Sequence, residues 1–195
     1  MMCPTPVTSI VLVGVGGQGI LLASDIMAHA AVHAGYQVKT NEVHGMAQRG
    51  GSVIAQIRYG RAVHSPLVEE GTARVLGALE ASEAIRFAHY LATDGEAIVS
   101  TQTIIPVTVS SGQATYPAQM DDTLRQVFSR VRYLDVVAVA ERLGNARAAN
   151  TVLLGALSQS LDLPLDAWHA ALAACVPEKH RQLNLHAFMA GRNDA

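Results

Sequence analysis

A glycine-rich loop near the start of the chain is the segment best suited to bind an anion. Gly14, Gly16 and Gly19 have the spacing G-x-G-x-x-G, after an apolar run at residues 10–13 and before a helical pattern. In a dinucleotide-binding unit these glycines make the tight turn, admit the ligand to the backbone and let the helix pack close to the strand. The N–H groups that open the helix lack intrahelical partners and favour a negative charge. The loop is therefore a candidate nucleotide or phosphate site.

Two interpretations of this loop stay open on the residues alone. Glu42 lies about 20 residues farther on, where a dinucleotide-binding fold places the acid that binds the ribose. The alternative is that the glycines only make a tight strand-to-helix turn in an α/β sheet.

A second loop, EVHGMAQRGGS at residues 42–52, gathers more polar and glycine residues than a connection requires. It is expected to follow a strand, and open α/β sheets bind ligands at the carboxyl ends of their strands. Arg49 offers a planar fork for a phosphate or carboxylate, and Gly50 and Gly51 let the backbone approach it. The alternative is a polar, hairpin-like loop with a solvated arginine. If the two loops follow neighbouring parallel strands, they should lie side by side and form one amide-rich rim.

Hydrophobic periodicity predicts the elements that would position these loops. The expected strands are residues 10–13, 36–41, 52–59, 75–79, 97–101 and 131–137, and the expected helices are residues 20–34, 81–91, 121–129, 165–175, 178–191 and a stretch from 139 that is interrupted at 144–145. This pattern predicts a three-layer α/β/α fold, Rossmann-like, with a mainly parallel or mixed sheet and a C-terminal helical extension. Residues 1–195 would form one domain, with an α/β core at 1–138 and a helical part at 139–195.

Several polar positions have expected surroundings of their own. The helical pattern after the fourth strand directs Glu80 and Glu83 outward. Asp94 and Gly95 predict a turn. Asn150 lies among apolar neighbours on a helix, so its amide must be hydrogen-bonded. It either ties the helix to a loop, which we favour, or faces a site.

The composition of the 195 residues excludes several classes of function. The net charge is -2 and the basic residues are scattered, so neither nucleic acid nor a membrane is expected as a partner. Apolar runs are shorter than the roughly 20 residues that span a bilayer, and the start lacks a signal-peptide pattern. Cys3 and Cys175 are the only cysteines, too few for a four-cysteine cluster or a disulfide framework, which indicates a reduced, cytoplasmic setting. The spacings of a P-loop, a nucleophile elbow and a metal site are absent, so no catalytic residue and no metal ligand is assigned.

Five blocks of the sequence together resemble a known family. They are GVGGQG at 14–19, EVHGMAQRGGSV at 42–53, SPLV at 65–68, LGNARAANTVLLGAL at 143–157 and VPEKHRQLNLHAF at 176–188. They are similar to the gamma-type subunit or domain of 2-oxoacid:ferredoxin oxidoreductases, and within that family to the indolepyruvate branch. Arg74 and Ser100 depart from the family pattern as we expect it, which puts the exact 2-oxoacid in doubt.

The resemblance implies a subunit of a heteromeric enzyme that decarboxylates an aryl 2-oxoacid such as indolepyruvate to an acyl-CoA and reduces ferredoxin. It implies no cofactor bound by this chain alone, with thiamine diphosphate and 4Fe-4S clusters in a large alpha-type partner subunit and CoA as a possible co-substrate. Two other functions stay open: a free-standing oxidoreductase that binds NAD or FAD, and a non-catalytic scaffold. The candidate binding residues are Gly14, Gly16, Gly17, Gln18, Gly19, His44, Gly45, Met46, Gln48, Arg49, Gly50, Gly51, Ser52, Asn145 and Asn150.

Overall fold

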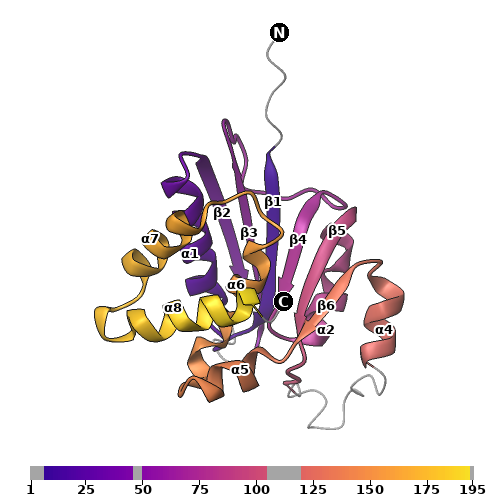
Figure 1. Ribbon diagram of the computed structural model, residues 1–195. Coiled ribbons are helices and arrows are strands. Elements are labelled where there is room, and N and C mark those ends of the chain that lie inside the picture. The colour runs from indigo at the N-terminus through magenta and orange to yellow at the C-terminus, as the bar shows by residue number, and fades with distance from the viewer. Residues whose placement is uncertain (1–6, 46–49, 105–119, 194–195) are drawn as a thin grey trace.

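A six-stranded mixed sheet forms the centre of the protein in the computed structural model, which describes residues 7–45, 50–104 and 120–193. Its order is β2-β3-β1-β4-β5-β6 (Figure 1). The strands are β1 (Thr8–Val15), β2 (Gln37–His44), β3 (Ser52–Gly60), β4 (Ala73–Ala78), β5 (Leu91–Ser100) and β6 (Val131–Leu134). β1, β4, β5 and β6 pair in parallel, whereas β3 pairs antiparallel with both β1 and β2. This sheet agrees with the expected α/β class.

The position of β3 corrects the expectation that β1 and β2 are parallel neighbours. β3 lies between them and runs in the opposite direction. The connection at residues 45–51 is too short for a crossover, because parallel strands need a link of about a dozen residues or more. The chain therefore returns as a hairpin beside β2, and β1 pairs with the far side of β3.

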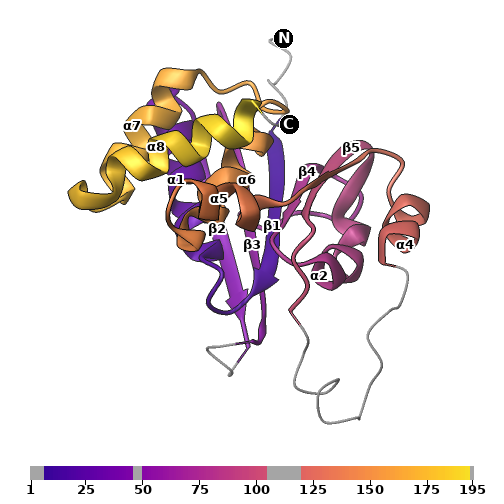
Figure 2. The same ribbon diagram turned by 60° about the horizontal axis from the view of Figure 1, so that its bottom comes forward.

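Helices cover both faces of the sheet, because side chains of β1 alternate between two apolar clusters. Ile10 and Leu12 point into the cluster shared with α1 (Ile20–His33), α5 (Val136–Arg142) and α6 (Ala149–Ser158). Val11 and Val13 point into the cluster shared with α2 (Ala81–Arg86) and α4 (Met120–Val127). Figures 1 and 2 show these helices on opposite sides of the sheet, which confirms the three-layer arrangement.

Two C-terminal helices add an outer cover on the first of these faces. α7 (Leu165–Cys175) packs on α1, and α8 (Glu178–Asn193) packs on α6 (Figure 2). The α6–α8 crossing is close because a glycine lies on each helix. A Cβ atom on Gly155 would overlap the carbonyl oxygen of Phe188, and one on Gly191 would overlap that of Val152. α6 is consequently buried between the sheet and α8.

The segment after β4 differs from its prediction in two ways. The expected helix at 81–91 ends at Arg86, and after a 3-10 turn at Ala88–Tyr90 the chain enters β5. Asp94 and Gly95 lie within β5 rather than in a separate turn, at a shift of its register against β4. The chain stays extended through this shift of register. The Asp-Gly pair that predicted a turn therefore lies in an irregular part of the strand.

Glu80 and Glu83 are buried, not directed outward as predicted. Glu80 caps α2: its Oε2 accepts hydrogen bonds from the N–H of Glu83 at 3.0 Å and from the hydroxyl of Ser82 at 2.6 Å. Glu83 accepts a hydrogen bond from Ser52 Oγ and pairs with Arg86 Nε at 3.2 Å. Donors at the start of α2 compensate the desolvation of Glu80, and Ser52 of β3 and Arg86 at the end of α2 compensate that of Glu83. The helical periodicity of the sequence does not reveal these partners.

α6, the first long helix of the C-terminal part, contacts the sheet directly. Arg132 on β6 pairs with Glu96 on β5 at 3.0 Å and donates a hydrogen bond to the carbonyl of Ala156 on α6 at 3.1 Å. A Cβ on Gly77 of β4 would lie 2.8 Å from Leu157 of α6, so the helix touches the strand closely. The division into a core at 1–138 and a helical part at 139–195 within one domain remains a prediction.

Two tyrosines should make stability fall at alkaline pH. Desolvation by burial raises the pKa of Tyr59 and that of Tyr133 to about 12, from 10.0. Between about pH 10 and 12 the unfolded chain ionises these phenols while the folded chain does not, so stability is present below pH 10 and decreases across that window. Urea unfolding at stepped pH should show this decline, and Tyr59→Phe should flatten it relative to the wild type. A spectrophotometric titration in which all five tyrosines ionise together near pH 10 would contradict this.

Candidate functional site

The glycine loop joins β1 to α1, and its glycines have different tasks from those predicted. Gly17 and Gly19 make the turn, with φ angles of 105° and 81° that favour glycine. Gly14 lies within β1, where a Cβ would come 2.7 Å from Gln18 Oε1. Gly19 packs closely, as expected, but against Asn150 on α6: a Cβ there would lie 2.7 Å from the Asn150 amide nitrogen.

Gln18 fills the inside of this loop with its side chain. Its Oε1 accepts a hydrogen bond from the N–H of Val15 at 2.8 Å. Its Nε2 donates to the carbonyl of Leu79 at 2.8 Å and to Gln102 Oε1 at 3.0 Å. Gln18 thus ties the carboxyl ends of β1, β4 and β5 together, and its contact with a ligand stays a prediction.

The two glycine loops lie side by side at the carboxyl end of β1. The N–H of Gly16 donates to the carbonyl of Gly51 at 2.8 Å, and the N–H of Gly50 donates to the carbonyl of Gly16 at 3.1 Å. The adjacency was predicted, but the antiparallel β3 produces it, not a parallel pair. The N–H of Gly16 is used in this contact, so it is not free to bind a ligand. The predicted role of Gly16 is therefore limited to letting a ligand approach its backbone from the pocket. Met46, Gln48 and Arg49 lie outside the described residues.

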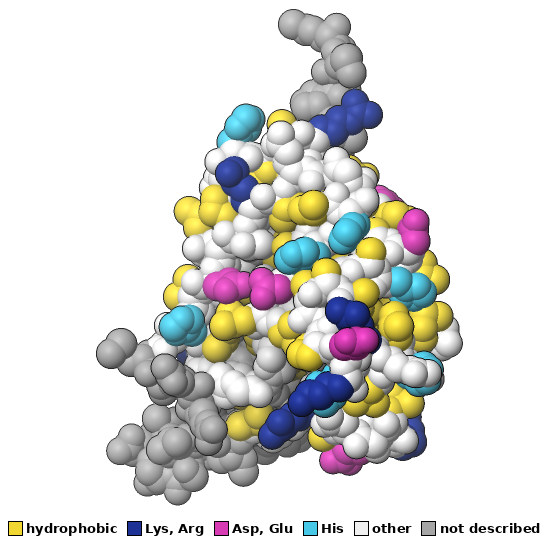
Figure 3. Space-filling model, turned by 90° about the vertical axis from the view of Figure 1, so that its left-hand side faces the viewer, with side chains coloured by type: hydrophobic (Ala, Val, Ile, Leu, Met, Phe, Trp, Pro, Cys, Tyr) yellow, Lys and Arg dark blue, Asp and Glu magenta, His cyan; other side chains and the backbone are white. Residues whose placement is uncertain are grey.

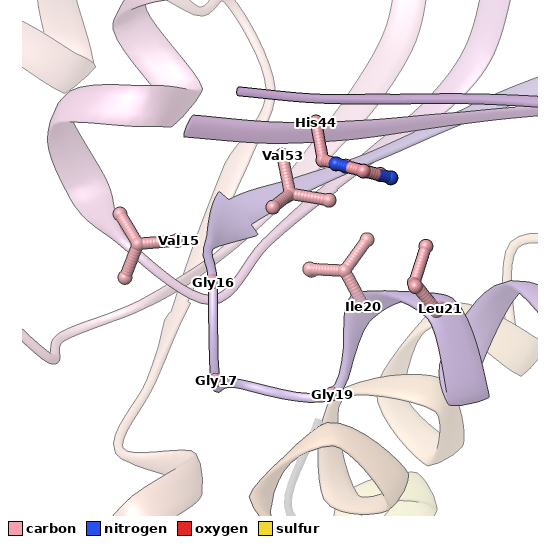
Figure 4. A pocket seen from close by; sticks show the side chains of 8 residues that line it. All are labelled: Val15, Gly16, Gly17, Gly19, Ile20, Leu21, His44 and Val53. Atoms are coloured by element: carbon pink, nitrogen blue, oxygen red, sulfur yellow. The ribbon is translucent and has the colours of Figure 1, made fainter. Parts of the chain in front are cut away.

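A pocket of about 420 Å³ opens between the glycine loop, the start of α1 and the hairpin of β2 and β3 (Figure 4). Apolar side chains form most of its wall, the glycine backbone supplies polar groups, and His44 borders it from β2. Leu21 lines it and is 42% exposed. This lining suits a ligand with an apolar portion, or a side chain of another protein, better than a bare phosphate. The lining residues are Val15, Gly16, Gly17, Gly19, Ile20, Leu21, His44 and Val53.

The surroundings of Glu42 correct its predicted role as a ribose-binding acid. Glu42 is exposed on β2 and pairs in register with Ala55 of β3. A dinucleotide-binding fold places that acid on the strand beside the one that enters the glycine loop, but here β3 takes that place. Gln18 also occupies the space above Gly14. The dinucleotide interpretation therefore lacks the geometry on which it depended.

The remaining candidates have local partners. Ser52 donates its hydroxyl to the buried Glu83, and the N–H of Gly45 donates to the Ser52 carbonyl at 3.4 Å. Asn150 Nδ2 donates to the carbonyl of Gly19 at 3.1 Å, which confirms that it ties its helix to the glycine loop. Asn145 Oδ1 accepts from the N–H of Arg147 at 3.0 Å and caps the short helix Ala146–Ala148.

Asn145 and Asn150 do not border the glycine-loop pocket but line a second one of about 220 Å³. This second pocket is also lined by Arg147, His180 and Asn184, which the sequence did not indicate as candidate binding residues. Its walls come from three segments that lie apart in the sequence, namely Leu22 of α1, residues 145–150 and residues 176–184, so only the tertiary structure brings them together.

Asn150→Ala should destabilise the protein by about 1 to 3 kcal/mol, because the carbonyl of Gly19 and the N–H of Thr151 lose a buried partner. Urea unfolding measures this. Asn145→Ala removes only the cap of a short surface helix and serves as the control, with a loss of about 1 kcal/mol or less. Equal losses for the two variants would contradict the tie.

The surface shown in Figure 3 mixes acidic, basic and histidine side chains with hydrophobic ones and shows no field of a single charge. Within the described residues, no three His, Cys, Asp or Glu side chains gather closely enough to hold a metal ion. No described helix combines the length and apolar character needed to cross a membrane.

Residues 9–193 match the family described as pyruvate ferredoxin/flavodoxin oxidoreductase. The chain belongs to this family. Among its relatives, the indolepyruvate oxidoreductase subunit IorB of Archaeoglobus fulgidus is 43% identical over 96% of this chain and 94% of the relative. That of Pyrococcus horikoshii is 41% identical over 94% and 93%. The predicted resemblance is thus confirmed.

Solved structures share the fold of this pyruvate ferredoxin/flavodoxin oxidoreductase family member. The gamma subunit of a keto/oxoacid ferredoxin oxidoreductase from Geobacter sulfurreducens has a TM-score of 0.71, with 24% identity over 96% of this chain and 98% of that one. The pyruvate oxidoreductase subunit PORC from Thermotoga maritima has a TM-score of 0.72, with 20% identity over 97% of each chain. At these identities the likeness establishes the fold alone.

Proposed function

We propose that this chain is the small, gamma-type subunit of a heteromeric 2-oxoacid:ferredoxin oxidoreductase that acts on indolepyruvate or another aryl pyruvate. The enzyme would decarboxylate the 2-oxoacid oxidatively to an acyl-CoA and pass the electrons to ferredoxin. The observation that carries this proposal is the 41 to 43% identity to indolepyruvate oxidoreductase subunits, which spans more than nine-tenths of both chains.

A large alpha-type subunit is the proposed partner, and it would carry thiamine diphosphate and the 4Fe-4S clusters. The two cysteines of this sequence support that division, because a cluster of this kind is held by four thiolates. This chain would bind no cofactor alone, and CoA would be the co-substrate. We place the complex in the cytoplasm because the cysteine content fits a reducing compartment.

The glycine-loop pocket is the proposed contribution of this chain to the catalytic region. Its glycine backbone and the first turn of α1 would attract an anionic group, and its apolar wall would take the adjoining apolar part of a ligand. Leu21, half exposed at this pocket, would be covered when the large subunit docks. A closed pocket excludes water and strengthens the electrostatic contacts made inside it.

Reconstitution tests this function. The chain and the large subunit are purified separately, and indolepyruvate-dependent reduction of ferredoxin is measured for each alone and for the mixture, with and without CoA. We expect activity only in the mixture, with pyruvate and 2-oxoglutarate as poorer substrates. Full turnover by the large subunit alone would overturn the proposal. Calorimetry of this chain with NAD, NADH and FAD is the companion control, and tight, Glu42-dependent binding would favour a free-standing dinucleotide enzyme instead.

A further inference from the structure

The second pocket is a notch of about 220 Å³ between the start of α8, the segment that opens α6 and the first turns of α1. Two of the blocks that carry the family resemblance, at 143–157 and 176–188, meet only here among the described pockets. Asn145, Arg147 and Asn150 come from the first block, and His180 and Asn184 from the second. The proposed reaction at the glycine loop uses none of the charged members of this set.

Two buried carboxamides line the notch. Asn150 is 2% exposed and Asn184 is 9% exposed. Each amide nitrogen has two N–H groups. Among the described residues each makes one hydrogen bond, to the carbonyl of Gly19 and to that of His180 respectively, which leaves one N–H on each. A buried donor without a partner costs about 1 to 3 kcal/mol, so the notch favours an occupant that accepts hydrogen bonds.

Arg147 brings a positive charge to the notch, and His180 brings an imidazole ring that can donate a hydrogen bond. Arg147 and His180 line it from different elements, both are exposed, and the side chain of Arg147 has no partner among the described residues. The first turn of α8 also carries Glu178, Lys179 and Arg181, none of which lines the notch. The guanidinium fork of Arg147 matches the geometry of a carboxylate or phosphate.

The remaining wall is apolar. Leu22, Val176 and Leu183 contribute side chains, and Ala148 and Pro177 complete the surface. Val176 and Ala148 are buried, Leu22 and Leu183 are half-buried, and Pro177 is exposed. Cationic and amide donors together with aliphatic side chains suit a small organic anion rather than a free inorganic ion.

We propose that this notch binds the anionic end of a small organic molecule, through Arg147, His180 and the spare amide donors of Asn150 and Asn184. The anionic group would be the carboxylate of an aryl 2-oxoacid or the phosphates of CoA. These two ligands are taken from the proposed function, on which this proposal rests. A hydrogen-bonded path joins this site to the first pocket, because Asn150 also holds the carbonyl of Gly19.

Isothermal titration calorimetry of the full chain with indolepyruvate, CoA and inorganic phosphate tests the site without relying on activity. We expect an organic probe to bind, and Arg147→Gln and His180→Gln each to weaken it about tenfold or more. Lys179→Gln is the matched control, since it removes a neighbouring charge that does not line the notch, and it should leave binding unchanged. The probe that binds identifies the source of the anion. Circular dichroism verifies that the variants fold.

Absence of binding by every probe at millimolar concentration would overturn the site, as would binding of phosphate alone. An equal loss in all three variants would also overturn it, because diffuse charge would then explain the binding. These outcomes are separable from failure of the proposed function, since the reconstituted complex can be active without the notch and the notch can bind in an inactive chain.

Discussion

Gly155→Ala should destabilise the protein by about 2 kcal/mol or more, although alanine is the better helix former by about 1 kcal/mol. The added methyl group would overlap the carbonyl oxygen of Phe188, and backbone cannot move aside as the end of a side chain can. α6 has no free side to shift toward, because the residues from Asn150 to Ser158 are all buried. Packing and helix propensity thus predict opposite signs, and thermal and urea unfolding decide between them.

Gly191→Ala should give a loss of the same kind, because its methyl group would overlap the carbonyl of Val152. Ala173→Val is the control: it adds more volume at an exposed position of α7 and should change stability by about 0.5 kcal/mol or less. An increase in stability for both glycine variants would show that the helices separate easily and that their close approach is not required.

Arg49→Ala should weaken the apparent affinity of the assembled complex for CoA or the 2-oxoacid by roughly 10- to 150-fold, since a hydrogen bond to a charged group contributes about 1.5 to 3 kcal/mol. Arg49 lies outside the described residues, but Gly50 and Gly51, which follow it, are hydrogen-bonded to Gly16 at the first pocket. Arg49→Lys should restore part of the affinity, because an ammonium keeps the charge but not the planar fork.

Steady-state kinetics with CoA and the 2-oxoacid varied separately measure this effect. Arg61→Ala is the matched control, because residue 61 is exposed just beyond the end of β3 that is remote from the glycine loop. If the Arg49 variants assemble normally with unaltered Michaelis constants and turnover, the loop is structural and a scaffold role gains support.

The features that sequence predicted well depend on local signals. The apolar run before Gly14 and the spacing of small residues after Gly19 define β1 and α1 within two residues at each end. Gly144 predicts the end of a helix because glycine readily adopts a positive φ, and its φ is 96°. Asn150 predicts a tie to a loop because a buried amide needs a hydrogen-bond partner, and it donates to the carbonyl of Gly19.

The features that sequence missed depend on long-range contacts. The short connection at residues 45–51 already requires β3 to run antiparallel to β2, but which strand pairs with the other edge of β3 depends on tertiary contacts. The buried Glu83 accepts a hydrogen bond from Ser52, 31 positions away. Arg147 and His180 share a notch only because α8 crosses α6. In each case the contact joins two elements that are far apart in the sequence.

The outer cover of α1 has a consequence for synthesis on the ribosome. α1 ends at His33, but the helix that packs on it, α7, begins at Leu165. Similarly, β1 gains its first strand partner only when Ser52 and the residues after it have been made. The nascent chain therefore displays the face of α1 that α7 later covers for most of its elongation, and a fragment that stops before α7 should aggregate rather than fold.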